Sequence, residues 1–188
     1  DGCAVRELLK YPNLEQIVMV DLAPAMTLLS QQHPVMLELN QGALLEPGIE
    51  IINQDAYTWL IAHPHSYDVI IIDLPDPKTI ELGRLYSYEF YRLCYQHLSD
   101  QGILITQAGS PYYAPRAFTC IQKTMQAAGF TTLGLHNQVL TLGEWGWVMG
   151  AKNWPDSKNL RTEVIQLQTG NLPMRWLKDE AFTLIASF

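Results

Sequence analysis

The sequence predicts an α/β fold with a doubly wound, mostly parallel sheet and an antiparallel last strand. Short apolar runs alternate with helix-like segments along most of the chain, as in parallel sheets that helices cover on both faces. The run Val69 to Ile72 consists of β-branched residues and predicts a strand that is buried on both faces. Two later runs, 131–138 and 144–151, are joined by a short loop, so we expect them to pair antiparallel.

The remaining elements follow from hydrophobic period and from bounding Pro, Gly and Asn residues. Expected helices cover 1–10, 24–32, 56–63, 85–94, 116–128 and 174–188, and further expected strands cover 17–21, 49–55 and 103–107. Residues 99–102 predict a turn, 153–158 a linker, and 162–167 a strand or an arm. This order is typical of the S-adenosylmethionine-dependent methyltransferase (Rossmann-like) sheet. We expect one domain over residues 1–151, truncated at its start, and a C-terminal extension over 152–188 packed on the same domain.

Composition indicates a globular protein, with 48% hydrophobic and 16% charged residues among 188. The net charge of −7 argues against a nucleic-acid partner and fits a cationic substrate. Cys3, Cys94 and Cys120 lie far apart without a CxxC spacing, which predicts reduced thiols in the cytoplasm and no zinc site. His63 and His65 flank a proline between a helix and a strand, and a loop is favoured there over a metal pair. No apolar run reaches the ~18 residues that span a bilayer, and no initiator Met is present, so we expect a piece of a longer chain.

Acidic residues follow three of the expected strands. Asp21, Asp55 and Asp73 come at carboxyl ends, where open α/β sheets bind ligands, and Asp76 follows in a loop with a proline on either side. Carboxylates gathered at one edge repel one another unless a cation or hydroxyl and amine donors lie between them. A solvated turn with a helix N-cap is the alternative for each acid. Asp1 precedes Asp21 by 20 residues, about the separation between a nucleotide-binding glycine loop and the acid that binds ribose hydroxyls.

Together these motifs resemble the aminopropyltransferases, the spermidine synthase family, and in particular its bacterial membrane-associated branch. The resemblance spans residues 1 to about 151 and rests on Asp1-Gly2 with Arg6-Glu7, Asp21, Asp55-Ala56, the stretch Tyr67 to Pro77, Gln107 with Ser110, and Gly143 to Gly146. It implies a catalytic domain that transfers an aminopropyl group from decarboxylated S-adenosylmethionine to a diamine such as putrescine. The products would be spermidine and methylthioadenosine, and no metal is implied.

The resemblance also implies roles for the site residues. Asp73 receives the proton of the acceptor amine or orients the freed amine, and Asp76 anchors the amine. Gln107, Tyr112 and Tyr113 line the acceptor site, although plain packing is an equal alternative for the two tyrosines. For the co-substrate, the resemblance implies that Asp1 and Gly2 bind the propylamine and that Asp21 binds the ribose hydroxyls. Asp55 and Ala56 would bind the adenine amino group.

This chain departs from the family pattern in several places. The glycines expected before Asp1, the central strand that carries them and an amino-terminal β-hairpin domain are absent, and Leu140-Thr141-Leu142 replaces a Pro-Thr-Tyr whose tyrosine touches the diamine. The sequence therefore does not identify the acceptor amine. The resemblance implies a homodimer, and a cytoplasmic domain that a further amino-terminal part would tether to a membrane.

Two other functions compete with aminopropyl transfer. One is an S-adenosylmethionine-dependent methyltransferase, but residues 73–76 do not form the Asp-Pro-Pro-Tyr-like acceptor motif that would favour it. The other is a non-catalytic polyamine- or nucleoside-binding domain, and the presence of Asp73 argues against it.

Overall fold

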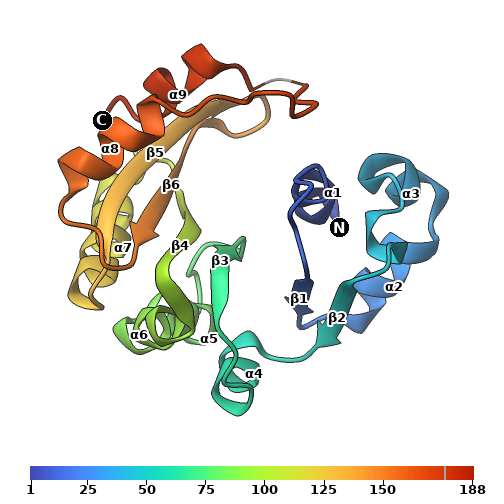
Figure 1. The fold of residues 1–188 in the computed structure, drawn as a ribbon. Helices are drawn as coiled ribbons and strands as arrows, with labels where there is room; N and C mark the ends of the chain where they lie inside the picture. The colour runs from blue at the N-terminus through green and yellow to red at the C-terminus, as the bar shows by residue number, and fades with distance from the viewer. Residues whose placement is uncertain (176) are drawn as a thin grey trace. The chain divides into compact units, whose positions relative to one another are not determined.

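A computed structural model describes residues 1–175 and 177–188, and the chain divides into two compact units (Figure 1). The amino-terminal unit comprises residues 1–62 with 170–173. The carboxyl-terminal unit comprises residues 63–169 with 174–188. No helix in the described part of the chain has the length and hydropathy that a membrane span requires.

The amino-terminal unit is built on two parallel strands, β1 (Ile17–Asp21) and β2 (Ile49–Asn53). Its helices are α1 (Cys3–Leu8), α2 (Pro24–Gln32), α3 (Pro34–Asn40), the 3-10 turn η1 (Ala43–Leu45) and α4 (Ala56–Ala62). A small apolar core forms where α1, β1 and η1 meet, and its buried members are Val5, Ile17, Ala43 and Leu44. The unit therefore places the carboxyl ends of two neighbouring strands at one edge.

Proline and left-handed residues set the helix ends in this unit. Pro24 and Pro34 occupy first-turn positions, where the missing N–H has no helical partner in any case. Gln41 follows α3 with a φ of 56°, and its N–H donates to the Leu37 carbonyl, which closes the helix. Helix α3 was not expected from the sequence, because Pro34 follows α2 so closely that one helix ends where the next begins.

The carboxyl-terminal unit contains a four-stranded mixed sheet in the order β3-β4-β6-β5. Its strands are β3 (Tyr67–Ile72), β4 (Leu98–Gly109), β5 (Thr131–Val139) and β6 (Gly143–Ala151). β3 and β4 run parallel, whereas β6 runs antiparallel to both β4 and β5. The antiparallel pair expected near the end of the chain is confirmed.

Helices cover both faces of this sheet (Figure 1). α7 (Pro115–Ala127) contacts β4, β5 and β6, while α8 (Ser157–Ile165) and α9 (Asp179–Ile185) contact β5. Two glycines of β6 allow α7 to pack closely against the sheet. A Cβ on Gly146 would lie 2.6 Å from the Phe118 ring, and one on Gly150 would lie 2.7 Å from Met125 Cε. The alternate strand residues face α8 and α9 in a core cluster, whose buried members are Leu133, Leu135, Met149, Ala151, Leu160, Val164 and Ala186.

Between β3 and β4 lie α5 (Ile80–Gly83), the 3-10 turn η2 (Arg84–Tyr86) and α6 (Tyr88–Gln96). The helix expected at 85–94 begins later, at Tyr88, because the Ser87 hydroxyl accepts a hydrogen bond of 3.2 Å from the Phe90 N–H and caps it. Leu85 and Tyr86 therefore belong to a separate turn beneath the loop that follows β3.

Two local expectations were wrong, and a third element is shorter than expected. Residues 99–102 lie inside β4 opposite the single residue Asp68, because Tyr67 pairs with Leu98 and Val69 pairs with Ile103. Residues 162–165 belong to helix α8, which Asp156 caps by accepting the Asn159 N–H at 2.8 Å, so the strand or arm is not found there. The terminal helix is limited to α9, and residue 176 of the expected range lies outside the described residues.

The expectation that β3 is buried on both faces was also wrong. Val69 is 51% exposed and Ile71 is 44% exposed, whereas Ile72 is 7% exposed. Among the described strands, β3 pairs with β4 alone and so forms the edge of its sheet. One face of the strand is therefore open within this unit.

Candidate active site

The loop after β3 presents two carboxylates at the carboxyl end of the strand. Asp73 follows the buried Ile72 and is exposed, and the Asp76 side chain is 37% exposed. Lys78 Nζ lies 3.8 Å from Asp76 Oδ2, but the lysine side chain is 81% exposed, so this surface pair contributes little. Both acids are thus accessible to a cationic ligand.

Gln107 brings the neighbouring strand to this loop. Thr106 of β4 lies opposite Ile72, so Gln107 reaches the same edge as Asp73. The Gln107 side chain is 5% exposed. Its Nε2 donates to the Leu74 carbonyl at 2.8 Å and lies 3.4 Å from Asp76 Oδ1, and its Oε1 accepts the Gly109 N–H at 3.0 Å. Of the acceptor-site residues expected from the sequence, Asp76 and Gln107 are in direct contact.

Tyr86 completes this network and was not singled out from the sequence. Its hydroxyl accepts from Gln107 Nε2 at 2.7 Å and lies 3.2 Å from the Leu74 carbonyl and 3.1 Å from the Pro75 carbonyl, to which it can donate. Burial raises the pKa of Tyr86 to about 12, and the negative charges of Asp76 and Asp73 act in the same direction against a hydrogen bond from Gln107 that lowers it. The phenol therefore stays protonated at neutral pH.

Tyr112 and Tyr113 lie in the loop between β4 and α7 and are 74% and 76% exposed. Their rings meet edge to face with centroids 5.1 Å apart, and the Tyr113 N–H donates to Ser110 Oγ at 3.1 Å. The loop begins at Gly109, where a Cβ would lie 3.8 Å from Asp76 Oδ1. Neither ring is part of the core, so the packing alternative for them is not supported.

The co-substrate residues expected from the sequence lie in the amino-terminal unit. Asp1 Oδ1 accepts the Cys3 N–H at 2.9 Å, and Gly2 adopts a φ of 85°. A Cβ on Gly2 would lie 2.8 Å from Leu44 Cγ, so the position requires glycine on two grounds. The fully buried Asn40, which the sequence did not reveal as important, donates to the Asp1 carbonyl at 2.9 Å and holds the start of α1 in place.

Asp21 is the last residue of β1, and Asp55 lies shortly after the end of β2, the parallel partner of β1. Asp21 lies opposite Asn53, whose Nδ2 donates to the Asp21 carbonyl at 3.3 Å, and Asp21 Oδ1 accepts the Ala23 N–H at 2.7 Å. Asp55 Oδ1 accepts both the N–H and the hydroxyl of Thr58 at 2.8 Å, just where Ala56 begins α4. Both acids thus make the local turn and cap bonds that were the alternative to a ligand role, and these bonds fix the orientation of each carboxylate.

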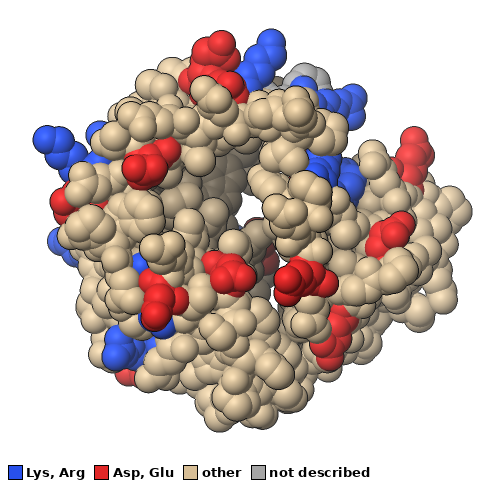
Figure 2. Space-filling view, in the orientation of Figure 1, with Lys and Arg blue, Asp and Glu red and all other residues tan. Residues whose placement is uncertain are grey.

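The expected site residues therefore form two sets, one in each unit. Asp73, Asp76, Gln107, Tyr112 and Tyr113 belong to the carboxyl-terminal unit, and Asp1, Gly2, Asp21, Asp55 and Ala56 belong to the amino-terminal unit. Within the described residues, no group of three His, Cys, Asp or Glu side chains is placed to hold a metal ion. Acidic side chains are scattered among uncharged ones in Figure 2, and some of them lie next to a lysine or an arginine.

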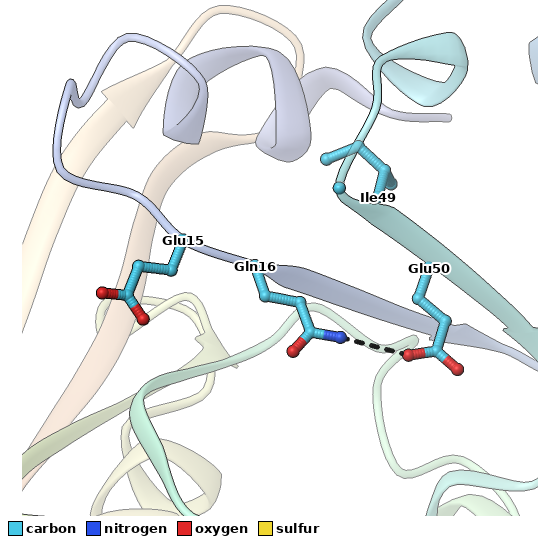
Figure 3. Close-up of a pocket in the computed structure, with 5 residues that line it drawn as sticks. Glu15, Gln16, Ile49 and Glu50 are labelled. Carbon is cyan, nitrogen blue, oxygen red and sulfur yellow. Dashed lines mark hydrogen bonds between the residues drawn. The ribbon is translucent and has the colours of Figure 1, made fainter.

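A shallow pocket in the amino-terminal unit lies away from these residues (Figure 3). It is lined by Glu15, Gln16, Gly48, Ile49 and Glu50 at the amino ends of β1 and β2, and Gln16 Nε2 donates to Glu50 Oε2 at 3.3 Å. Asp21 lies at the opposite end of β1, so this pocket is not part of the candidate site.

Comparison with known proteins gives consistent matches. A family model described as the spermine/spermidine synthase domain matches residues 1–159. Polyamine aminopropyltransferase 2 of Ralstonia nicotianae is 42% identical over 156 residues, which are 83% of this chain and 31% of that protein. The polyamine aminopropyltransferase of Oceanobacillus iheyensis is 36% identical over an alignment of 190 positions, which covers 100% of this chain and 35% of that protein. The chain thus spans about a third of the length of these curated relatives.

Solved structures show the same fold. Spermidine synthase from Thermotoga maritima superimposes with a TM-score of 0.80 at 20% identity, covering 100% of this chain and 62% of that one. A spermidine synthase in complex with the transition-state analogue AdoDATO superimposes with a TM-score of 0.82 at 21% identity, covering 100% of this chain and 63% of that one. The predicted fold class is confirmed.

Proposed function

Because the chain belongs to the spermine/spermidine synthase family, we propose that it forms part of an enzyme that transfers an aminopropyl group from decarboxylated S-adenosylmethionine to a diamine such as putrescine. The observation that carries the proposal is the arrangement at the carboxyl ends of β3 and β4. There, Asp73 and Asp76 lie at the two ends of a short proline-containing segment. The buried side chains of Gln107 and Tyr86 form hydrogen bonds with its carbonyls and with each other. Two accessible carboxylates on a fixed loop match a ligand with positively charged amines.

In the proposed reaction, an amine of the acceptor attacks the propyl carbon bonded to the sulfonium sulfur. The new C–N bond forms with the nitrogen lone pair, while the C–S bond breaks and its electrons neutralise the sulfonium to give methylthioadenosine. An ammonium has no lone pair, so the acceptor must first lose a proton. Asp73 takes this proton or orients the free amine, and Asp76 binds the acceptor cation.

The amino-terminal unit supplies the co-substrate contacts in this proposal. Asp1 and Gly2 meet the propylamine, Asp21 the ribose hydroxyls, and Asp55 with Ala56 the adenine amino group. Their support is the position of Asp21 and Asp55 at the carboxyl ends of two paired parallel strands, together with the backbone hydrogen bonds that orient the carboxylates of Asp1 and Asp21. Tyr112 and Tyr113 line the acceptor side, since both rings are exposed on the loop that begins beside Asp76.

The proposal extends to assembly and location. We propose a homodimer in the cytoplasm, as the family resemblance implies, with a tether to the membrane through a further part of the protein. Among the described residues all three cysteines are free, which fits a reducing compartment. The acidic net charge of −7 fits a small cationic diamine as partner and not a nucleic acid.

Assay of the full-length protein with decarboxylated S-adenosylmethionine and a panel of diamines tests the proposal. Methylthioadenosine should appear in equal amount to the aminopropylated amine, and only when a diamine is present. Methyl transfer from S-adenosylmethionine would establish the methyltransferase alternative. Tight binding of amines without turnover would establish the non-catalytic one.

A further inference from the structure

We infer that Tyr86 is a positioning residue for the diamine: together with Gln107 it fixes the loop 74–76 and thereby the Asp76 carboxylate that binds the acceptor. This inference rests on the proposed function and names a residue that the sequence patterns did not identify. Tyr86 would therefore affect the binding of the acceptor and not the binding of the co-substrate.

The Lys78 N–H donates to the Asp76 carbonyl at 2.7 Å, but the Leu74 and Pro75 carbonyls of the loop are contacted by side chains. Pro75 and Pro77 have no N–H to donate, so the loop cannot tie itself into a regular turn through those positions. Its carbonyls at Leu74 and Pro75 instead face Tyr86, whose hydroxyl lies 3.2 Å and 3.1 Å from them. Gln107 Nε2 approaches the Leu74 carbonyl from the neighbouring strand at 2.8 Å.

Counting donors shows why Tyr86 and Gln107 act as a unit. The Gln107 amide has two N–H groups, and its nearest acceptors are the Tyr86 oxygen at 2.7 Å and the Leu74 carbonyl at 2.8 Å, whereas Asp76 Oδ1 is farther at 3.4 Å. Because Tyr86 accepts from Gln107, its own proton is free to reach the loop carbonyls. Removing the hydroxyl leaves one Gln107 N–H without its acceptor and deprives the two carbonyls of the single proton that lies within reach of both.

The chemistry of Tyr86 suits a positioning role and not an acid–base one. The residue is 7% exposed, and its hydroxyl is engaged with the loop and with Gln107. A phenol whose pKa lies near 12 does not release its proton at neutral pH. Its effect should therefore be seen in the binding of the acceptor more than in the chemical step.

The test is Tyr86→Phe in the full-length enzyme, with Tyr91→Phe as the matched control. Tyr91 is also a buried tyrosine, on α6, and its hydroxyl makes no hydrogen bond to residues 74–76 in the described structure. We expect Tyr86→Phe to raise the KM for putrescine about tenfold, which corresponds to ~1.4 kcal/mol. The KM for decarboxylated S-adenosylmethionine and the affinity for methylthioadenosine should stay within twofold of the parent, and Tyr91→Phe should leave all three unchanged.

A second variant tests whether Tyr86 and Gln107 act together. Gln107→Met keeps the length of the side chain but removes the amide, so it should raise the putrescine KM as well, and the double variant should lose less than the product of the two single losses. A parent enzyme without turnover would refute the proposed function itself. With an active parent, an unchanged putrescine KM in folded Tyr86→Phe would overturn the inference. If that variant does not fold, an unchanged KM in Gln107→Met would overturn it, and a raised KM would support it.

Discussion

Gln107 Nε2 lies 3.4 Å from Asp76 Oδ1, although Gln107 is near the end of β4, Asp76 is in the loop after β3, and the two are 31 positions apart. The contact exists because β3 and β4 run parallel in a register that sets Thr106 opposite Ile72. Parallel neighbours deliver their carboxyl ends to one edge, and here that edge receives one amide and two carboxylates. The acceptor side of the proposed site is therefore a product of strand register.

The first prediction concerns Asp73. Asp73→Asn should lower turnover by roughly 10²–10⁴-fold, the range for a lost general base, because the amide cannot accept the proton of the diamine. Methylthioadenosine binding should change little. The control is Asp68→Asn, an exposed acid at the amino end of the same strand, which accepts a bond from Ser99 Oγ at 2.9 Å. Turnover of Asp73→Asn within a few-fold of the parent would show that Asp73 is not the base.

The second prediction concerns the choice of co-substrate. In the proposed co-substrate site, a carboxylate brought near Asp1 meets a like charge, and at an effective dielectric near 20 such a pair ~4 Å apart costs about 4 kcal/mol before screening. We expect the full-length protein to bind decarboxylated S-adenosylmethionine at least about tenfold more tightly than S-adenosylmethionine. Calorimetry with both ligands measures the ratio, and Asp1→Asn should reduce it. Equal affinities would favour the methyltransferase alternative.

The third prediction concerns Gly2 and uses Gly42 as its matched control. Both glycines have positive φ, 85° and 71°, but a Cβ on Gly2 would press on Leu44 Cγ at 2.8 Å, whereas a Cβ on Gly42 would meet no atom within 4 Å. Gly2→Ala should therefore lower the free energy of unfolding by about 1–3 kcal/mol more than Gly42→Ala, the usual effect of overpacking. Urea unfolding measures both variants. Equal losses would mean that backbone strain alone matters at Gly2.

The fourth prediction concerns stability at high pH. The folded protein raises the pKa of Tyr86 from 10.0 to about 12, chiefly by burial, so it favours the neutral phenol. The resulting stabilisation is complete below pH 10 and is lost as the pH rises through 12, by an amount on the order of 2 kcal/mol. Tyr86→Phe should remove this part of the alkaline loss. Tyr88→Phe, at a tyrosine that is 46% exposed, should retain the parent's profile in urea unfolding at pH 9.5 and 11.5.

Local sequence patterns predicted the elements whose signals are local. The apolar run before Asp21 and the proline at Pro24 set β1 and α2 at the expected bounds. Helix α8 was missed because its start depends on the Asp156 cap, within a stretch that reads as a linker. The exposure of Val69 and Ile71 depends on what covers their face of β3, and a β-branched run carries no such information.

The same limit applies to the site. Asp73 and Asp76 were proposed because they follow an apolar run at a strand end, and Gln107 was proposed because it matches the family pattern. Tyr86 was placed in the helix expected over residues 85–94, and a sequence pattern does not tell which way a phenol turns its hydroxyl. Its contacts with the loop and with Gln107 become visible only in the structure, where η2, the loop and β4 come together. The central strand that the family order places beside β1 and β3 stays a prediction, and each of these strands has one partner among the described residues.

The open edge of β3 has a consequence for handling the protein. An edge strand offers unpaired N–H and C=O groups, and here Val69 and Ile71 add exposed apolar surface beside them. Residues 1–188 produced by themselves should therefore aggregate through intermolecular strand addition as concentration rises. Val69→Lys should suppress this, because a charged side chain at an edge opposes further pairing. Light scattering over a concentration series measures the effect. A parent that aggregates no more than the variant would show that this edge does not mediate association.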